Sequence, residues 1–73
     1  MSDTAKRTYF ASGFLSRRNI CHMIKSVELG YMICFDSIGR SYEFYAGTGK
    51  IQGYRHIRGI FALADLIDTA KEV

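Results

Sequence analysis

The clearest local pattern of side chains lies in the middle of the chain, between residues 31 and 46. Two segments, separated by turn-forming residues at 36–40, each carry bulky side chains at every second position. These side chains are Tyr31, Ile33 and Phe35 in the first segment and Tyr42, Phe44 and Ala46 in the second. A period of two is typical of strands with one buried face. The pattern therefore predicts a β-hairpin.

The register of this hairpin follows from the same pattern. A turn of four residues pairs Phe35 with Tyr42 and Ile33 with Phe44, whereas a slip by one residue sets Phe35 and Ile33 opposite polar residues. We expect the first register, because it makes one continuous aromatic and aliphatic face. The expected core residues of the hairpin are Tyr31, Phe35, Tyr42 and Phe44, and the expected open face holds Met32, Cys34, Glu43 and Tyr45.

Before the hairpin, apolar residues recur at helical spacing between Ser16 and Gly30. The members of this stripe are Ile20, Ile24 and Val27, widened by Cys21 and Met23. Ser16 is a favourable N-cap and Gly30 a favourable residue beyond a helix end. The pattern predicts a helix over residues 17–29, and its β-branched content leaves a strand over residues 20–29 as the alternative.

After the hairpin, residues 50–52 are a candidate third strand, and a helical pattern follows from Tyr54. Its apolar positions are Ile57, Ile60, Phe61, Ala64, Ile67 and Ala70. Steps of three and four predict an amphipathic helix that runs close to the end of the chain. Gly59 within this pattern costs about 1 kcal/mol relative to Ala, so the alternative is a helix that starts near Gly59.

The predicted fold class is α+β, with a small antiparallel sheet packed by an N-terminal helix and a C-terminal amphipathic helix. We expect residues 1–8 to be a flexible tail and residues 9–73 to be a single α+β domain. Both helices are expected on one face of the sheet. Since 48% of the 73 residues are apolar, more than so small a body can hide, we also expect a homo-oligomer that covers part of this surface.

Composition and charge favour a folded, mildly basic protein. The chain lacks proline, contains no low-complexity tract and has a net charge of +3. No secretory signal and no run of about 20 apolar residues is present, so we expect a cytoplasmic protein with no membrane association. Cys21 and Cys34 are then expected to be free, buried thiols.

The segment Y-A-G-T-G-K-I-Q-G-Y-R-H-I-R-G, residues 45–59, combines glycines and cations without a carboxylate. Backbone N–H groups near glycines, together with Lys and Arg, are the groups that hold a phosphate. The glycine spacing matches neither the P-loop nor G-x-G-x-x-G, and a turn also explains it. The predicted ligand-binding residues are Gly47, Thr48, Gly49, Lys50, Tyr54, Arg55, His56 and Arg58. Arg55 and Arg58 are expected to share a helix face.

No catalytic grouping or metal-ligand spacing is present, so we expect neither an enzyme nor a cofactor or metal site. The neighbouring Cys21 and His22 point in different directions in any regular element. The first functional hypothesis is a non-enzymatic module that holds an anionic ligand, a nucleotide or another phosphate compound.

Two further hypotheses concern macromolecular partners. In size and organisation alone, the chain resembles small phage or mobile-element proteins that inhibit or sequester host components. The resemblance covers no particular residues and implies an inhibitor that blocks a host protein or its nucleic-acid site. Independently of it, Arg17 and Arg18 form a basic spot and Tyr45 is an aromatic residue on the expected open face, so these three are the candidate partner contacts. The third hypothesis is a nucleic-acid-binding protein, for which the basic charge is the only signal.

Overall fold

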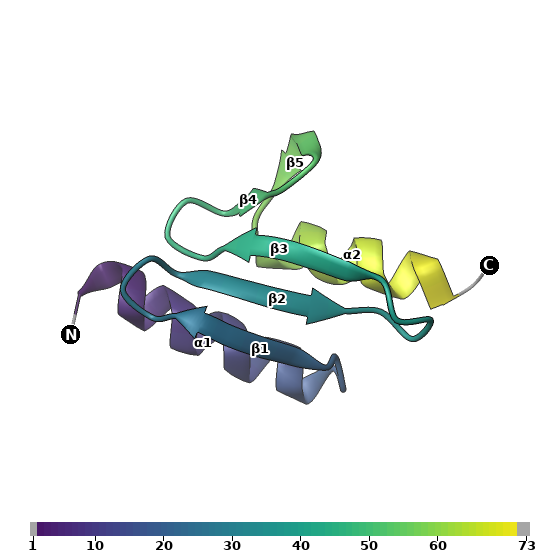
Figure 1. The fold of residues 1–73 in the computed structure, drawn as a ribbon, viewed down its shortest axis with the longest axis horizontal. Coiled ribbons are helices and arrows are strands. Elements are labelled where there is room, and N and C mark those ends of the chain that lie inside the picture. The colour runs from purple at the N-terminus through teal and green to yellow at the C-terminus, as the bar shows by residue number, and fades with distance from the viewer. Residues whose placement is uncertain (1, 72–73) are drawn as a thin grey trace.

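The computed structural model describes residues 2–71 and consists of a sheet with two helices on one face (Figure 1). In chain order the elements are α1 (Asp3–Arg17), β1 (His22–Ser26), β2 (Tyr31–Phe35), β3 (Ser41–Tyr45), β4 (Lys50–Ile51), β5 (Tyr54–Arg58) and α2 (Ile60–Lys71). The five strands are antiparallel, and their order in the sheet is β1-β2-β3-β4-β5. The predicted α+β class is confirmed, as are the third strand and the placement of both helices on one face.

Helix α1 begins much earlier than predicted. Residues 3–8, expected to belong to a flexible tail, form its first turns, and Met1 lies outside the described residues. The Ser2 side chain caps the helix by accepting a hydrogen bond from the backbone N–H of Ala5, at 3.1 Å. The face of α1 that packs on the sheet carries the buried residues Ala5, Thr8, Ala11 and Leu15. These mostly small side chains let the helix lie close to the strands.

The helix predicted over residues 17–29 is wrong, and the alternative strand is correct. Ser16 lies in the last turn of α1 instead of starting a helix. Asn19 adopts a left-handed conformation with φ of 59°, and its N–H donates to the Ser16 carbonyl while the Ile20 N–H donates to the Leu15 carbonyl. This pair of bonds is a Schellman motif, which ends the helix. Gly30 then lies in the turn between β1 and β2.

The hairpin of β2 and β3 is confirmed, but its predicted register is wrong. Phe35 pairs with Ser41 and Ile33 with Glu43, one residue away from the expected pairing. The inner face of the hairpin therefore carries Met32, Cys34, Tyr42 and Phe44, all of them buried. The outer face carries Tyr31, Ile33, Phe35, Glu43 and Tyr45. Met32 and Cys34, which were expected on the open face, are in the core. Tyr31 and Phe35, which were expected in the core, lie on the outer face.

The core lies between the inner face of the sheet and the two helices. Its buried members are Ala11, Leu15, Ile20, Met32, Cys34, Tyr42, Phe44, Ile51, Leu63, Ala64 and Ile67. Helix α2 contributes the last three of these and begins at Ile60, so the expectation of a helix from Tyr54 is wrong and the alternative start near Gly59 is correct. Gly59, with φ of 103°, accepts the first hydrogen bond of the helix from the Leu63 N–H.

Two glycines permit a close approach between the N-terminus of α1 and two loops. A Cβ atom on Gly30, which has φ of 69°, would lie 2.9 Å from the backbone nitrogen of Gly47 and 3.1 Å from Cγ2 of Thr4. A Cβ atom on Gly47 would lie 3.1 Å from the same threonine side chain. Arg7 adds a hydrogen bond, donated from Nη1 to the Gly47 carbonyl at 2.6 Å. These contacts fasten the turn after β1 and the loop after β3 to α1.

Gly30→Ala is expected to lower the free energy of unfolding by about 2 kcal/mol or more, because it combines a positive φ with a backbone clash. Gly13→Ala is the matched control: it lies within α1 with no heavy atom within 4 Å of its added Cβ. That change is expected to raise stability by about 0.5–1 kcal/mol through helix propensity. Urea unfolding of both variants measures the difference. Equal effects of the two substitutions would contradict the close approach at Gly30.

The turn between β2 and β3 is organised by the buried Asp36. Its Oδ1 accepts hydrogen bonds from the backbone N–H groups of Ile38 and Arg40, and its Oδ2 accepts one from the Tyr42 hydroxyl at 2.9 Å. Burial opposes the charge on this carboxyl, but the hydrogen bonds from Arg40, Tyr42 and Ile38 outweigh it and lower the pKa of Asp36.

Because the pKa of Asp36 is lowered in the folded state, its charge stabilises the protein above the ordinary Asp pKa of about 3.9. This contribution is lost as the pH falls through the lowered value. Asp36→Asn is therefore expected to lower the melting temperature at neutral pH, with a difference from wild type that shrinks towards pH 2–3. The exposed Asp65→Asn is the control. A difference that stays constant with pH would show that the carboxylate charge plays no part.

Candidate anion-binding site

The hairpin of β4 and β5 extends away from the other three strands (Figure 1). Its pairing is irregular: Lys50 pairs with Arg58 and Ile51 with Tyr54, so two residues of β4 face five of β5. The surplus residues make β5 bow outward, and all five of its residues are exposed. An exposed strand at the edge of a sheet presents both its backbone and its side chains to a partner.

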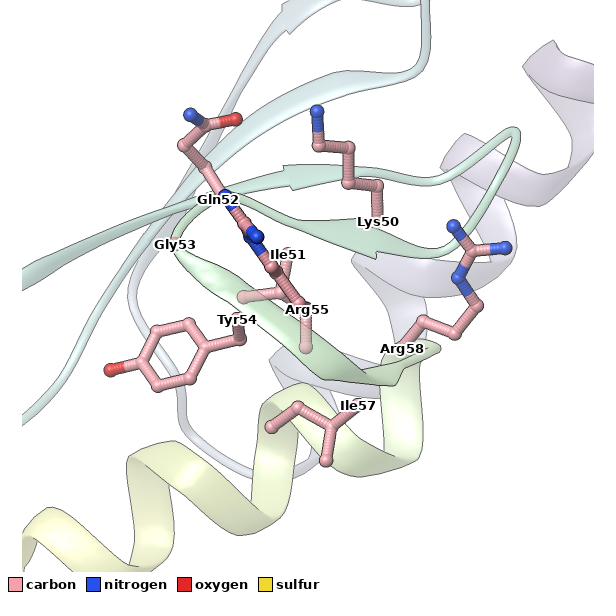
Figure 2. Close-up of a pocket in the computed structure, with 8 residues that line it drawn as sticks. All are labelled: Lys50, Ile51, Gln52, Gly53, Tyr54, Arg55, Ile57 and Arg58. Carbon is pink, nitrogen blue, oxygen red and sulfur yellow. The ribbon is translucent and has the colours of Figure 1, made fainter.

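A cavity of about 590 Å³ lies against this hairpin. It is lined by Lys50, Ile51, Gln52, Gly53, Tyr54, Arg55, Ile57 and Arg58. Figure 2 shows the side chains of Lys50, Arg55 and Arg58 extending to the same side of the hairpin, while Ile57 points towards α2. We call these three cations the cationic hairpin site.

The charge arrangement at this site is unusual for a pair of strands. Lys50 and Arg58 are direct cross-strand partners, and side chains in such positions lie about 4.5–5.5 Å apart at Cβ. Like charges at this distance destabilise a sheet. None of the lining residues is acidic, and within residues 2–71 none of the three cations forms an ion pair. The site therefore has positive charge without an internal counter-charge.

Arg55 and Arg58 line this cavity from an element that the sequence pattern did not predict. They were expected to share a helix face, which is wrong because both belong to β5. Residues three apart on a regular strand point to opposite faces. The irregular pairing of β4 with β5 is what allows both arginines to line one cavity.

The glycine loop does not supply the cavity lining. Gly47, Thr48 and Gly49 are outside the lining set, and three consecutive backbone N–H groups here, those of Thr48, Gly49 and Lys50, already have acceptors. The N–H groups of Thr48 and Gly49 both donate to the Tyr45 carbonyl, and the N–H of Lys50 donates to the Thr48 hydroxyl. A phosphate cradle requires consecutive N–H groups to be free, and these three are not. The loop instead forms the turn that leads into β4, and the positive charge of the cavity comes from the side chains of the residues that follow the loop.

The other predicted contact residues lie apart from one another. His56 is exposed on β5 but outside the cavity lining. Arg18, at the end of α1, lies 3.3 Å from a carboxylate oxygen of Asp68 and 4.7 Å from the centre of the Phe14 ring. Arg17 is exposed in the last turn of the same helix. Tyr45 lies on the outer face of the sheet, so the predicted partner contacts do not form one surface.

The sequence pattern missed four of the lining residues, Ile51, Gln52, Gly53 and Ile57. It also missed a contact between α1 and β1. Ser12 Oγ lies 2.7 Å from Nε2 of His22, and Nδ1 of this histidine lies 2.9 Å from the Ile20 carbonyl oxygen. In a neutral ring, Nδ1 must donate to that carbonyl, so Nε2 accepts from the serine hydroxyl. The pair ties the helix to the edge strand. No spacing signal marks it, because the two residues belong to different elements.

The two cysteines differ more than expected. Cys34 is buried, and burial raises the pKa of its thiol to about 12. Cys21 is exposed, so the expectation that both thiols are buried is wrong for this residue. Within residues 2–71 no three His, Cys, Asp or Glu side chains lie close enough to hold a metal ion.

Comparisons with protein-family models, curated proteins and solved structures give no match to this chain. Neither helix in the described part of the chain has the length and hydropathy needed to cross a membrane. The function is therefore inferred from the geometry of the site.

The thiols provide a direct test of the packing. In the native protein one thiol equivalent, that of Cys21, is expected to react with Ellman's reagent at pH 8, and the second only after addition of denaturant, since a buried thiol with a raised pKa is inert. Cys21→Ser should remove the native reaction entirely. Equal reaction rates of both thiols in the folded protein would contradict the burial of Cys34.

Proposed function

We propose that this chain is a non-enzymatic binding module that holds the phosphate groups of a nucleotide-type ligand at the cationic hairpin site. The observation that carries the proposal is the direct pairing of Lys50 with Arg58, with Arg55 lining the same cavity. An anion between the paired cations converts a repulsive contact into two attractive ones.

The three cations suit phosphate better than a single carboxylate. Two arginines present planar forks that can bind phosphate oxygens in pairs, and the lysine adds a mobile point charge. A ligand with several phosphate oxygens can engage all three, whereas a carboxylate has only two oxygens to share. Binding energy at exposed charges is screened by salt, so the affinity is expected to fall as ionic strength rises.

A polar neighbour favours a ligand with an organic part. Gln52 also lines the cavity, and its amide can donate or accept hydrogen bonds at the edge of a base. Tyr54 lines the cavity as well, but its ring lies 6.4 Å from that of the inner-face Tyr42. The amide supports a nucleotide-type ligand over free phosphate.

The test is calorimetric titration of the protein with ATP and with inorganic tripolyphosphate at low salt. The Lys50→Ala, Arg58→Ala double variant is expected to bind at least tenfold more weakly, because it removes the cross-strand cation pair. The Lys6→Ala, Lys25→Ala double variant removes the same charge from exposed positions on α1 and β1 and is the matched control. It should bind within about twofold of wild type.

Thermal melts of both variants should stay close to wild type, because exposed substitutions of this kind change stability by about 0.5 kcal/mol at most. Equal losses in both double variants would mean that net charge alone attracts the anion. Failure of the wild-type protein to bind either compound at millimolar concentration would overturn the proposal.

A further inference from the structure

One cross-strand row on the outer face of the sheet joins two tyrosines to the cationic hairpin site. The register pairs Tyr31 with Tyr45, Tyr45 with Lys50 and Lys50 with Arg58. Direct partners across a regular sheet share a face, so Tyr31, Tyr45 and Lys50 lie on the side that the helices leave uncovered. The pairing of Lys50 with Arg58 is irregular, but Figure 2 shows both side chains on the same side of the hairpin. With strands about 4.8 Å apart, the row extends over about 14 Å.

The tyrosine end of this row is a preformed stacking surface. The rings of Tyr31 and Tyr45 are stacked, with centroids 5.1 Å apart and planes at 19°. The Tyr31 hydroxyl donates to Oε1 of Glu43 at 2.5 Å, which holds its ring in place. Since Tyr31 covers one face of the Tyr45 ring and Lys50 is the partner on the other side, the second ring face is turned towards the cations.

We propose that the ligand of the cationic hairpin site is a single-stranded nucleic acid, with a base stacked on Tyr45 and the adjoining phosphates on Lys50 and Arg58. The inference rests on the proposed phosphate-binding function and specifies the partner of that site. Surfaces that bind single strands combine a cationic track for the backbone with aromatic rings for the bases. Here both parts lie in one row of one sheet face.

The openness of the face favours a polymer over a free nucleotide. Small-ligand sites enclose most of the ligand surface, about 70–90% of it. Here every residue of β5 is exposed, and the tyrosine pair lies on an uncovered sheet face, so little of a mononucleotide would be enclosed. An extended strand needs no enclosure, because it adds up the contacts of several nucleotides.

The same geometry disfavours duplex DNA or RNA and sets the path of the strand. Bases in a duplex are already stacked on their neighbours and cannot stack on Tyr45. Glu43 lies on the outer face beside the tyrosines, so its carboxylate repels phosphates from that end of the row. The sugar-phosphate backbone is therefore expected on the side of β4 and β5, with the bases directed towards β3.

The experiment is fluorescence anisotropy with a labelled 12-nucleotide oligothymidylate and with a duplex of the same length. Tyr45→Ala is expected to weaken single-strand binding about tenfold or more, whereas Tyr45→Phe keeps the ring and should stay within about threefold of wild type. Tyr45→Leu retains apolar bulk without a stacking ring and should behave like Tyr45→Ala. Circular dichroism melts of the three variants confirm that they fold.

The salt dependence provides an independent measurement. For single strands, each phosphate contact contributes about 0.7 to the slope of log affinity against log salt. Loss of two contacts in the Lys50→Ala, Arg58→Ala variant should therefore make the slope shallower by about 1.4. Tyr45→Ala should lower the affinity while leaving the slope unchanged.

Titration with tripolyphosphate separates failure of this inference from failure of the proposed function. Loss of oligothymidylate binding in Tyr45→Ala, with tripolyphosphate binding retained, supports the inference. If wild type binds tripolyphosphate but binds the single strand no more tightly, or binds the duplex equally well, or is unaffected by Tyr45→Ala, the nucleic-acid inference is overturned and phosphate binding stands. If wild type binds neither compound, both proposals are overturned.

Discussion

The pairing of β2 with β3 in a single register is the constraint on which the rest of the structure depends. It is held at the turn by Asp36, which accepts two backbone hydrogen bonds and one from the Tyr42 hydroxyl. These bonds place Tyr42 on the inner face, and the period of two then places Phe44 inside and Tyr45 outside. A slip by one residue would bury Glu43 and expose the aromatic core. The register therefore sets both what the helices cover and what the open face presents.

Sequence reasoning predicted the elements near this hairpin but not its register, for a physical reason. Every residue from Tyr31 to Phe35 is apolar, so β2 has no polar face that would reveal which side is buried. Only β3 carries this information, since Ser41 and Glu43 alternate with Tyr42 and Phe44. The expectation gave weight to matching large residues across the strands, whereas the structure buries the smaller Met32 and Cys34 under the helices. The open aromatic row on the outer face could not be predicted without this correction.

The N-terminal helix was predicted at residues 17–29 instead of 3–17, because the signals of the real helix are weak or ambiguous. Its buried face includes Ala5, Thr8 and Ala11, which contribute little hydropathy, yet such small residues allow close packing on a sheet. The serine at position 16 was interpreted as a cap at a helix start, although the same residue types also occur in a last turn. The helix ends after Ser16 because Asn19 adopts the left-handed conformation. This conformation depends on the hydrogen bonds accepted by the Ser16 and Leu15 carbonyls as much as on the residue type at position 19.

The candidate site was predicted in part: several of its residues are correct, but the elements that carry them differ from those expected. Lys50, Tyr54, Arg55 and Arg58 do line one cavity, but they come from a bowed strand pair and not from a glycine cradle followed by a helix. The same charges have a second consequence at the edge of the sheet. Antiparallel pairing of β5 with β5 of another copy would bring their arginines together, and charged residues on an edge strand oppose such association. Among residues 2–71 no acidic side chain pairs with the cations of this edge, so it remains available to a polyanion. The arrangement that discourages self-association through β5 therefore also favours the proposed partner.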